Sequence, residues 1–184
     1  MTRPLFLNLE ADLFDIVETE ANASKVIAID GVYGVGKSFL ARRLSDRFGY
    51  TLVGCDAFVR QGSGQLSYPE ILDLNRLRGT VTAEIARNHP VVVESILLRL
   101  VLESLGIKDI FHVYVKRKHL DGRFSHEELF DDARTEEELI AGCNEISRML
   151  GDTDDSPYLD YQLTRYHKRT LPHNKANVLY EVCF

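Results

Sequence analysis

One glycine-rich segment restricts what this chain can fold into more than any other feature of the sequence. Residues 31–38 read GVYGVGKS and match the pattern G-x-x-x-x-G-K-[S/T] at every fixed position. Glycines let the backbone curl so that successive N–H groups point at phosphate oxygens, and the first turn of the next helix adds partial positive charge. In such a loop Lys37 neutralises the β- and γ-phosphates, and the Ser38 hydroxyl ligates Mg²⁺. The segment therefore predicts a site for ATP and Mg²⁺.

The surroundings of this loop agree with a phosphate-binding role. An apolar strand is predicted over 25–30 and a helix over 37–48, so the loop connects a strand to a helix. By average residue frequencies the fixed positions recur by chance in fewer than about 1% of chains of this length. The alternative is a glycine-rich turn that binds nothing. We expect the nucleotide to contact the loop, the residue after it and one later arginine: Gly31, Val32, Tyr33, Gly34, Val35, Gly36, Lys37, Ser38, Phe39 and Arg117.

Short apolar runs alternate with helical stretches along the rest of the chain. This alternation predicts crossover connections and a parallel sheet covered by helices on both faces. No linker is long enough to divide the chain, so we expect a single domain over residues 1–184. The predicted strands are 25–30, 51–55, 91–93, 110–115 and 177–182, and the predicted helices are 9–22, 37–48, 69–88, 97–105 and 157–170.

The overall charge limits the classes of partner. The chain has 22 basic and 28 acidic residues, a net charge of −6, which disfavours extensive binding to nucleic acid or to an anionic membrane but leaves a local basic groove open. The longest apolar run, 96–105, is interrupted by Arg99 and Glu103, and the N-terminus lacks the apolar core of a signal peptide. Three cysteines without a CxxC pair indicate reduced thiols. We therefore expect a cytoplasmic protein, and a homodimer remains open.

Two acidic residues follow predicted strands directly. Ligands of parallel sheets bind at the carboxyl ends of the strands, so Asp56 and Glu94 are expected at the same edge as the glycine-rich loop. Asp56 could accept the proton of an attacking hydroxyl, and four residues of apolar strand leading into Glu94 are typical of an acid that holds Mg²⁺. The alternatives are a helix N-cap for Asp56 and a structural salt bridge for Glu94.

Arginines follow the fourth predicted strand. Arg117 and Arg123 lie in a polar stretch, about 117–150, that is expected to form a helical lid. Arginines on such a lid could clamp phosphates, and its closure would exclude water from the transfer. Acidic residues crowd the same stretch, so a solvated helix face is the alternative for each arginine.

Four segments together resemble the uridine kinase and phosphoribulokinase branch of the P-loop kinases. They are IDGVYGVGKS at 29–38, CDAF at 55–58, YPEILDLNRL at 68–77 and VVVESILL at 91–98. The resemblance implies a three-layer P-loop fold with a five-stranded parallel sheet in the order 2-3-1-4-5. It also implies that Asp56 orients or deprotonates the acceptor hydroxyl, that Glu94 is the metal-linked acid of the third strand, and that a lid begins at Arg117. The substrate residues are Asp56, Phe58, Arg60, Tyr68, Glu94 and Arg123.

This chain also departs from that family's pattern. Ser95 stands where the family has glycine, and residues 57–59 (AFV) lack the usual tyrosine, so the acceptor stays open. The predicted function is ATP-dependent phosphorylation of a hydroxyl on a nucleoside, sugar or vitamin-like metabolite, with Lys37 and Asp56 as catalytic residues and Ser38 and Glu94 as metal ligands. One alternative is a regulatory ATP-binding module without an acceptor. Another is a nucleotide or polynucleotide kinase, whose basic groove would rely on Arg60, Arg76 and Arg78.

Overall fold

A single parallel sheet forms the centre of the molecule. The computed structural model describes residues 3–61, 66–130, 133–149 and 158–183. Within these ranges the sheet has six strands in the order β1-β6-β5-β2-β4-β3, and every neighbouring pair is parallel. The strands are β1 (Leu5–Leu7), β2 (Val26–Asp30), β3 (Thr51–Gly54), β4 (Val91–Glu94), β5 (Ile110–Lys118) and β6 (Val178–Cys183).

The number of strands and the order of the complete sheet differ from the sequence prediction. The added strand, β1, pairs with β6 at the edge of the sheet, outside the five strands that the sequence predicted. Leu5 and Phe6 in this strand are about half exposed and Leu7 alone packs against the core, so the strand is too short to show an apolar pattern in the sequence. It is a strand because it pairs with β6, and that pairing is a long-range contact.

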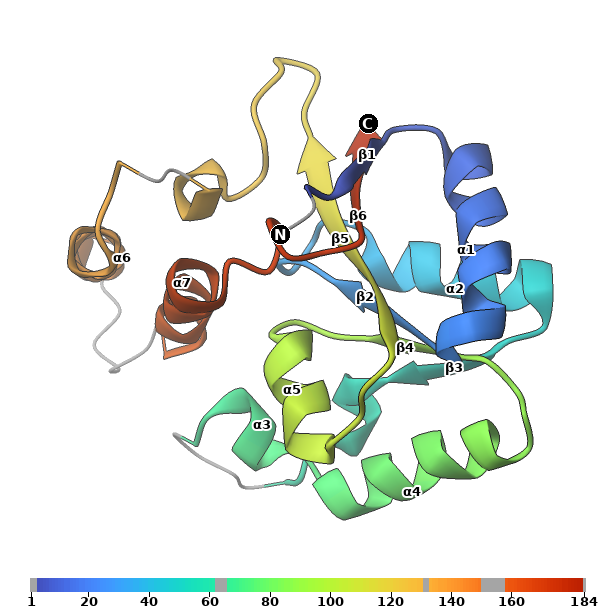
Figure 1. The fold of residues 1–184 in the computed structure, drawn as a ribbon. Helices are drawn as coiled ribbons and strands as arrows, with labels where there is room; N and C mark the ends of the chain where they lie inside the picture. The colour runs from blue at the N-terminus through green and yellow to red at the C-terminus, as the bar shows by residue number, and fades with distance from the viewer. Residues whose placement is uncertain (1–2, 62–65, 131–132, 150–157, 184) are drawn as a thin grey trace.

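Helices cover both faces of the sheet. Right-handed crossovers place α1 (Glu10–Ser24) and α2 (Lys37–Phe48) on one face, because both connections run toward the β3 edge. The connections through α4 (Leu74–Ala86), α5 (Leu98–Leu105) and α7 (Tyr158–Thr170) run the opposite way and lie on the other face, as Figure 1 shows. None of the helices in the described ranges is both long and apolar enough to span a membrane.

The predicted helix over 69–88 is two helices. α3 (Tyr68–Ile71) ends at Leu72, whose extended backbone forms an isolated antiparallel bridge with Val59. Asp73 then caps α4 by accepting the backbone N–H of Arg76 at 3.0 Å. The break sets α3 apart from α4, and it is α3 that carries Tyr68.

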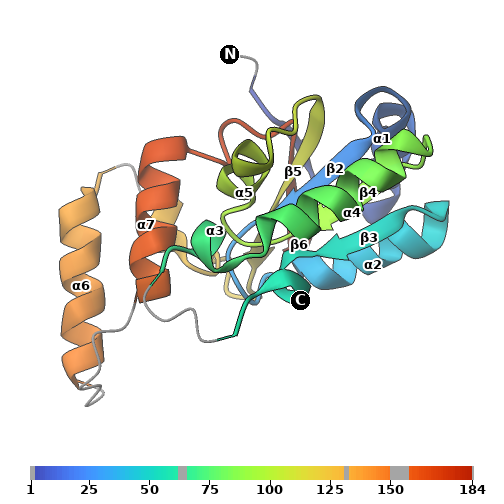
Figure 2. The ribbon, with the colours of Figure 1, turned by 90° about the horizontal axis from the view of Figure 1, so that it is seen from below.

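The predicted lid is partly helical. It contains a short 3₁₀ turn, η2 (Glu127–Phe130), and α6 (Glu136–Met149). Figure 2 shows α6 beside α7 at one end of the molecule, and Glu136 pairs with Arg169 at 2.7 Å across these helices. This segment therefore docks on α7, and α7 lies between it and the sheet (Figure 1).

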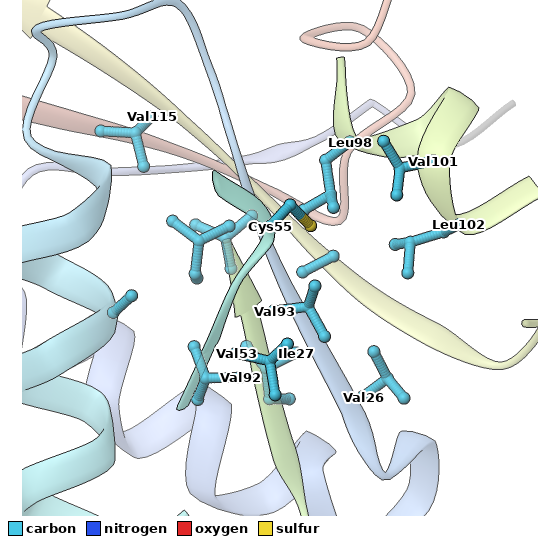
Figure 3. Close-up of a cluster of buried hydrophobic side chains, with 14 of the residues drawn as sticks. Val26, Ile27, Val53, Cys55, Val92, Val93, Leu98, Val101, Leu102 and Val115 are labelled. Atoms are coloured by element: carbon cyan, nitrogen blue, oxygen red, sulfur yellow. The ribbon is translucent and has the colours of Figure 1, made fainter. Parts of the chain in front are cut away.

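The apolar core lies between the sheet and both helical layers. Figure 3 shows its centre, where β-branched side chains of β2 and β4 meet leucines of α5. Burying one such side chain contributes roughly 1.5–3 kcal/mol. The labelled core residues include Val26, Ile27, Val53, Val92, Val93, Leu98, Val101 and Leu102. This packing fixes the strand ends, and with them the residues that follow each strand.

Candidate active site

The glycine-rich loop connects β2 to α2 in the shape that its sequence predicts. Gly31, Gly34 and Gly36 have φ angles of 148°, 73° and 100°, which residues with a side chain rarely adopt. A Cβ atom added to Gly31 would lie 2.6 Å from the carbonyl oxygen of Val115 on β5. The loop therefore needs glycine at position 31 both for its backbone angle and for its close approach to the neighbouring strand.

Lys37 begins α2 and is buried among three carboxylates. Its Nζ donates to the carbonyl oxygen of Val32 at 2.6 Å, so the side chain lies against the loop. Burial lowers the pKa of Lys37, and the nearby charges of Asp30, Glu94 and Asp56 oppose that shift. The acids that follow three different strands thus converge on the lysine that the motif assigns to the phosphates.

Ser38 and Glu94 meet beside Lys37. The Ser38 hydroxyl donates to Oε2 of Glu94 at 3.2 Å. Burial raises the pKa of Glu94, while Lys37 and the Ser38 hydroxyl act in the opposite direction. Gly54 leaves room for this carboxylate, since a Cβ atom there would lie 3.1 Å from Oε1 of Glu94.

These two side chains fit Mg²⁺, which prefers hydroxyl and carboxylate oxygens and commonly shares its ligands with substrate phosphates. Among the described residues no group of three or more His, Cys, Asp or Glu side chains could hold a metal on its own. A magnesium ion at Ser38 and Glu94 would therefore complete its coordination with water and with phosphate oxygens of a bound nucleotide.

Asp56 lies in the 3₁₀ turn η1 (Cys55–Phe58) that follows β3, and a tyrosine holds it. The Tyr68 hydroxyl donates to Oδ1 of Asp56 at 2.5 Å and accepts from the Ser95 hydroxyl at 2.9 Å. Burial raises the pKa of Tyr68 above its ordinary value, and the bond to Asp56 raises it further, so Tyr68 acts as a neutral donor. The Tyr68 backbone N–H donates to Oε1 of Gln162 on α7 at 2.6 Å. Tyr68 therefore connects three segments of the chain.

Asp30, the last residue of β2, is a site residue that the sequence analysis did not single out. Its carboxylate is fully buried and accepts from Gly31 N–H at 2.7 Å, from Tyr166 and from His112 Nε2 at 3.2 Å. Burial alone would raise the pKa of Asp30, but the hydrogen bonds from His112, Tyr166 and the Gly31 N–H act in the opposite direction and lower it. The pattern that predicts a functional role for Glu94, an acid at the end of an apolar strand, is equally present at Asp30.

The other predicted substrate residues occupy different positions. The Phe58 side chain is buried beneath the guanidinium of Arg76, whose Cζ lies 4.9 Å from the ring centroid. Arg60 donates to the carbonyl oxygen of Glu70 and lines a cavity of about 520 Å³ beside α3, which Asp56 and Tyr68 do not line. The structure therefore brings Tyr68 to Asp56, whereas the ring of Phe58 packs under Arg76.

The loop contacts the lid segment and α7 through Tyr33. The Tyr33 hydroxyl donates to Oδ1 of Asp160 at 3.0 Å, and its ring packs edge-on against His126 with centroids 4.6 Å apart. Burial and the nearby Asp160 raise the pKa of Tyr33 to about 12. Phe39, by contrast, is largely exposed on α2.

The two predicted lid arginines differ in their surroundings. Arg117 Nη1 donates to the carbonyl oxygen of Gly34 at 3.2 Å and so lies beside the loop. Arg123 is exposed and pairs with Asp121 at 2.7 Å in the turn after β5. Arg117 is thus positioned at the loop, and no described contact brings Arg123 to it.

Comparison with known proteins identifies the fold. No family model matches the sequence, and no curated protein matches it. Among solved structures, a possible uridine kinase from Bacillus stearothermophilus superposes with a TM-score of 0.50 at 15% identity, over 92% of this chain and 98% of that chain. The two share a fold. A structure from Chloroflexus aurantiacus j-10-fl, whose assignment as a kinase is itself provisional, has 19% identity, 88% coverage of both chains and a TM-score of 0.42.

Proposed function

We propose that this protein transfers the γ-phosphoryl group of ATP to a hydroxyl group of a small metabolite, a nucleoside, a sugar or a vitamin-like alcohol. The observation that carries the proposal is the position of Asp56. An exposed carboxylate, fixed by the buried Tyr68, lies at the same edge of the sheet as the glycine-rich loop and interacts electrostatically with Lys37. A switch that only binds nucleotide needs no such fixed base.

Each of the described site residues would have a distinct role in phosphoryl transfer. The loop N–H groups and Lys37 would hold the β- and γ-phosphates, and Ser38 and Glu94 would hold Mg²⁺, which supplies charge neutralisation when bound. Asp56 would orient the acceptor hydroxyl and take its proton. Catalysis of this kind depends mainly on positioning and on fixed charges, and Tyr68 supplies the positioning of the base.

Contacts above the loop support the exclusion of water. Tyr33 joins the loop to His126 and Asp160, and Arg117 reaches the carbonyl of Gly34. These contacts join the segment after β5 and the start of α7 to the loop. A kinase needs such a cover because water would otherwise compete with the acceptor.

An ADP-release assay against nucleosides, sugars, vitamin-like alcohols and nucleotides tests the proposal. One acceptor class should stimulate ADP release, and Asp56→Asn should reduce that rate by about 10²–10⁴-fold while MgATP still binds by calorimetry. Asp109→Asn is the matched control, because Asp109 is exposed and its left-handed backbone also suits asparagine. Unchanged turnover in Asp56→Asn would remove Asp56 from the mechanism. ATP binding without stimulation by any acceptor would favour a regulatory module instead.

A further inference from the structure

A second polar cavity lies on the face of the sheet opposite α2. It has a volume of about 280 Å³ and lies between α5, the start of β5 and the segment that leads into β6. Its volume is just below the roughly 300–1,000 Å³ of typical ligand pockets, which suits a compact metabolite.

The lining of this cavity includes two basic side chains and one acid. Arg99 and Lys175 are its basic residues, and Glu103 is the one acid among the described lining residues. In the part of the chain that the structure describes, neither Arg99 nor Lys175 forms an ion pair with a carboxylate. A guanidinium and an ammonium facing the same cavity favour an oxyanion, because arginine presents paired donors that match carboxylate and phosphate oxygens.

The wall of the cavity is built from a fixed hydrogen-bond network. His112 is only 4% exposed, and its backbone N–H donates to Oδ1 of Asn177 at 2.8 Å. Arg99 Nη1 lies 3.2 Å from His112 Nδ1 and 3.3 Å from the carbonyl oxygen of Lys175. Arginine can only donate, so Nδ1 must accept and the imidazole proton must be on Nε2. In this arrangement Nε2–H is directed at Asp30.

The same network reaches the glycine-rich loop. His112 Nε2 donates to Asp30 Oδ2 at 3.2 Å, and Asp30 Oδ1 accepts the N–H of Gly31 at 2.7 Å. An anion that draws the Arg99 guanidinium toward itself removes the donor that holds the His112 tautomer. The carboxylate of Asp30, which accepts the first N–H of the loop, would then lose a fixed hydrogen-bond partner at its other oxygen.

We propose that this cavity is a binding site for a compact metabolite with an oxyanion group, a phosphate or a carboxylate, and that its occupation changes the nucleotide affinity of the loop. The site is separate from Lys37 and Asp56, and its binding part does not depend on the function proposed above.

Calorimetric titration with two probes, inorganic phosphate and succinate, tests the site. The titrations use the full chain with Lys37→Ala, which weakens the competing phosphate site of the loop. At least one probe should bind with a Kd of about 1 mM or tighter. Adding Arg99→Gln or Lys175→Gln should weaken binding about tenfold or more, because each removes a charged donor. Lys108→Gln has the same charge change outside the cavity and is the control.

The two probes also distinguish the two sources of the oxyanion, since preference for phosphate or for succinate identifies the group. No binding of either probe, or binding that both cavity variants leave unchanged, would overturn the site. The linkage to the loop is measured in the unmodified chain as the Kd of MgATP with and without saturating succinate. A change of about fivefold or more that Arg99→Gln abolishes is expected. Equal affinities would overturn the linkage, and failure of ATP to bind would instead count against the proposed function.

Discussion

The bond between Tyr68 and Asp56 provides the sharpest test of the candidate active site. Tyr68→Phe removes one hydroxyl, which donates to Asp56 at 2.5 Å and accepts from Ser95 at 2.9 Å, and keeps the buried ring. Asp56 itself is exposed, so without this donor its carboxylate is free to rotate toward solvent. We therefore expect the substitution to misplace the base without unfolding the site.

The lost hydrogen bond from Tyr68 to Asp56 determines how far kcat should fall. A hydrogen bond to a charged group contributes about 1.5–3 kcal/mol, and each 1.36 kcal/mol in the barrier is tenfold in rate. If that energy serves to position Asp56 in the transition state, kcat falls by roughly 10–150-fold. The KM for ATP should stay unchanged, because Tyr68 has no described contact with the loop or with Lys37. The Ser95 hydroxyl loses its acceptor, which costs about 1 kcal/mol and lowers Tm by roughly 2–4 °C.

The assay is steady-state ADP release with the acceptor found in the panel, together with a thermal melt. Tyr50→Phe is the matched control, since Tyr50 stacks on Phe48 away from the site, with ring centroids 5.1 Å apart. Its kcat should equal that of the parent. A Tyr68→Phe variant with a lowered Tm but a kcat within about twofold of the parent would show that Tyr68 only supports the fold, and the positioning argument would fail.

Three further predictions concern the loop and the buried histidine. Lys37→Ala should weaken MgATP binding by at least about tenfold in calorimetry, because it removes a charged donor to the phosphates. Gly31→Ala should destabilise the fold by more than about 2 kcal/mol in urea unfolding, because its Cβ would lie 2.6 Å from the Val115 carbonyl oxygen. The control is Gly142→Ala in α6, where a Cβ has open space; it should stabilise the fold by up to about 1 kcal/mol. Burial lowers the pKa of His167, so the unfolded chain takes up a proton below about pH 6.5 that the folded protein does not. The free energy of unfolding should therefore fall between pH 7.5 and pH 5.5 by at most about 1.4 kcal/mol per pH unit. The fall should be smaller in His167→Gln. An equal fall in the parent and the variant would exclude His167 as a cause.

Features that depend on residues close together in the chain could be predicted from the amino-acid sequence. The glycine-rich loop, its flanking strand and helix, and the acids at the ends of β3 and β4 follow from short-range patterns: backbone angles that only glycine tolerates, unbroken β-branched runs, and the rule that parallel strands present their carboxyl ends at one edge. The five predicted strands all form for this reason. β1 was missed because an exposed three-residue strand carries no such pattern.

The contacts between side chains far apart in the sequence needed the tertiary structure. Tyr68 reaches Asp56 only because α3 breaks from α4 at Leu72, and it reaches Ser95 only because β4 lies beside β3. The bond from Tyr166 to Asp30 spans 136 residues. Sequence periodicity determines which face of an element is buried, but the crossovers and the packing of whole layers determine which side chains meet there. The loop could therefore be recognised in the sequence, while the support of Asp56 and the polar network behind Asp30 could be seen only in the folded chain.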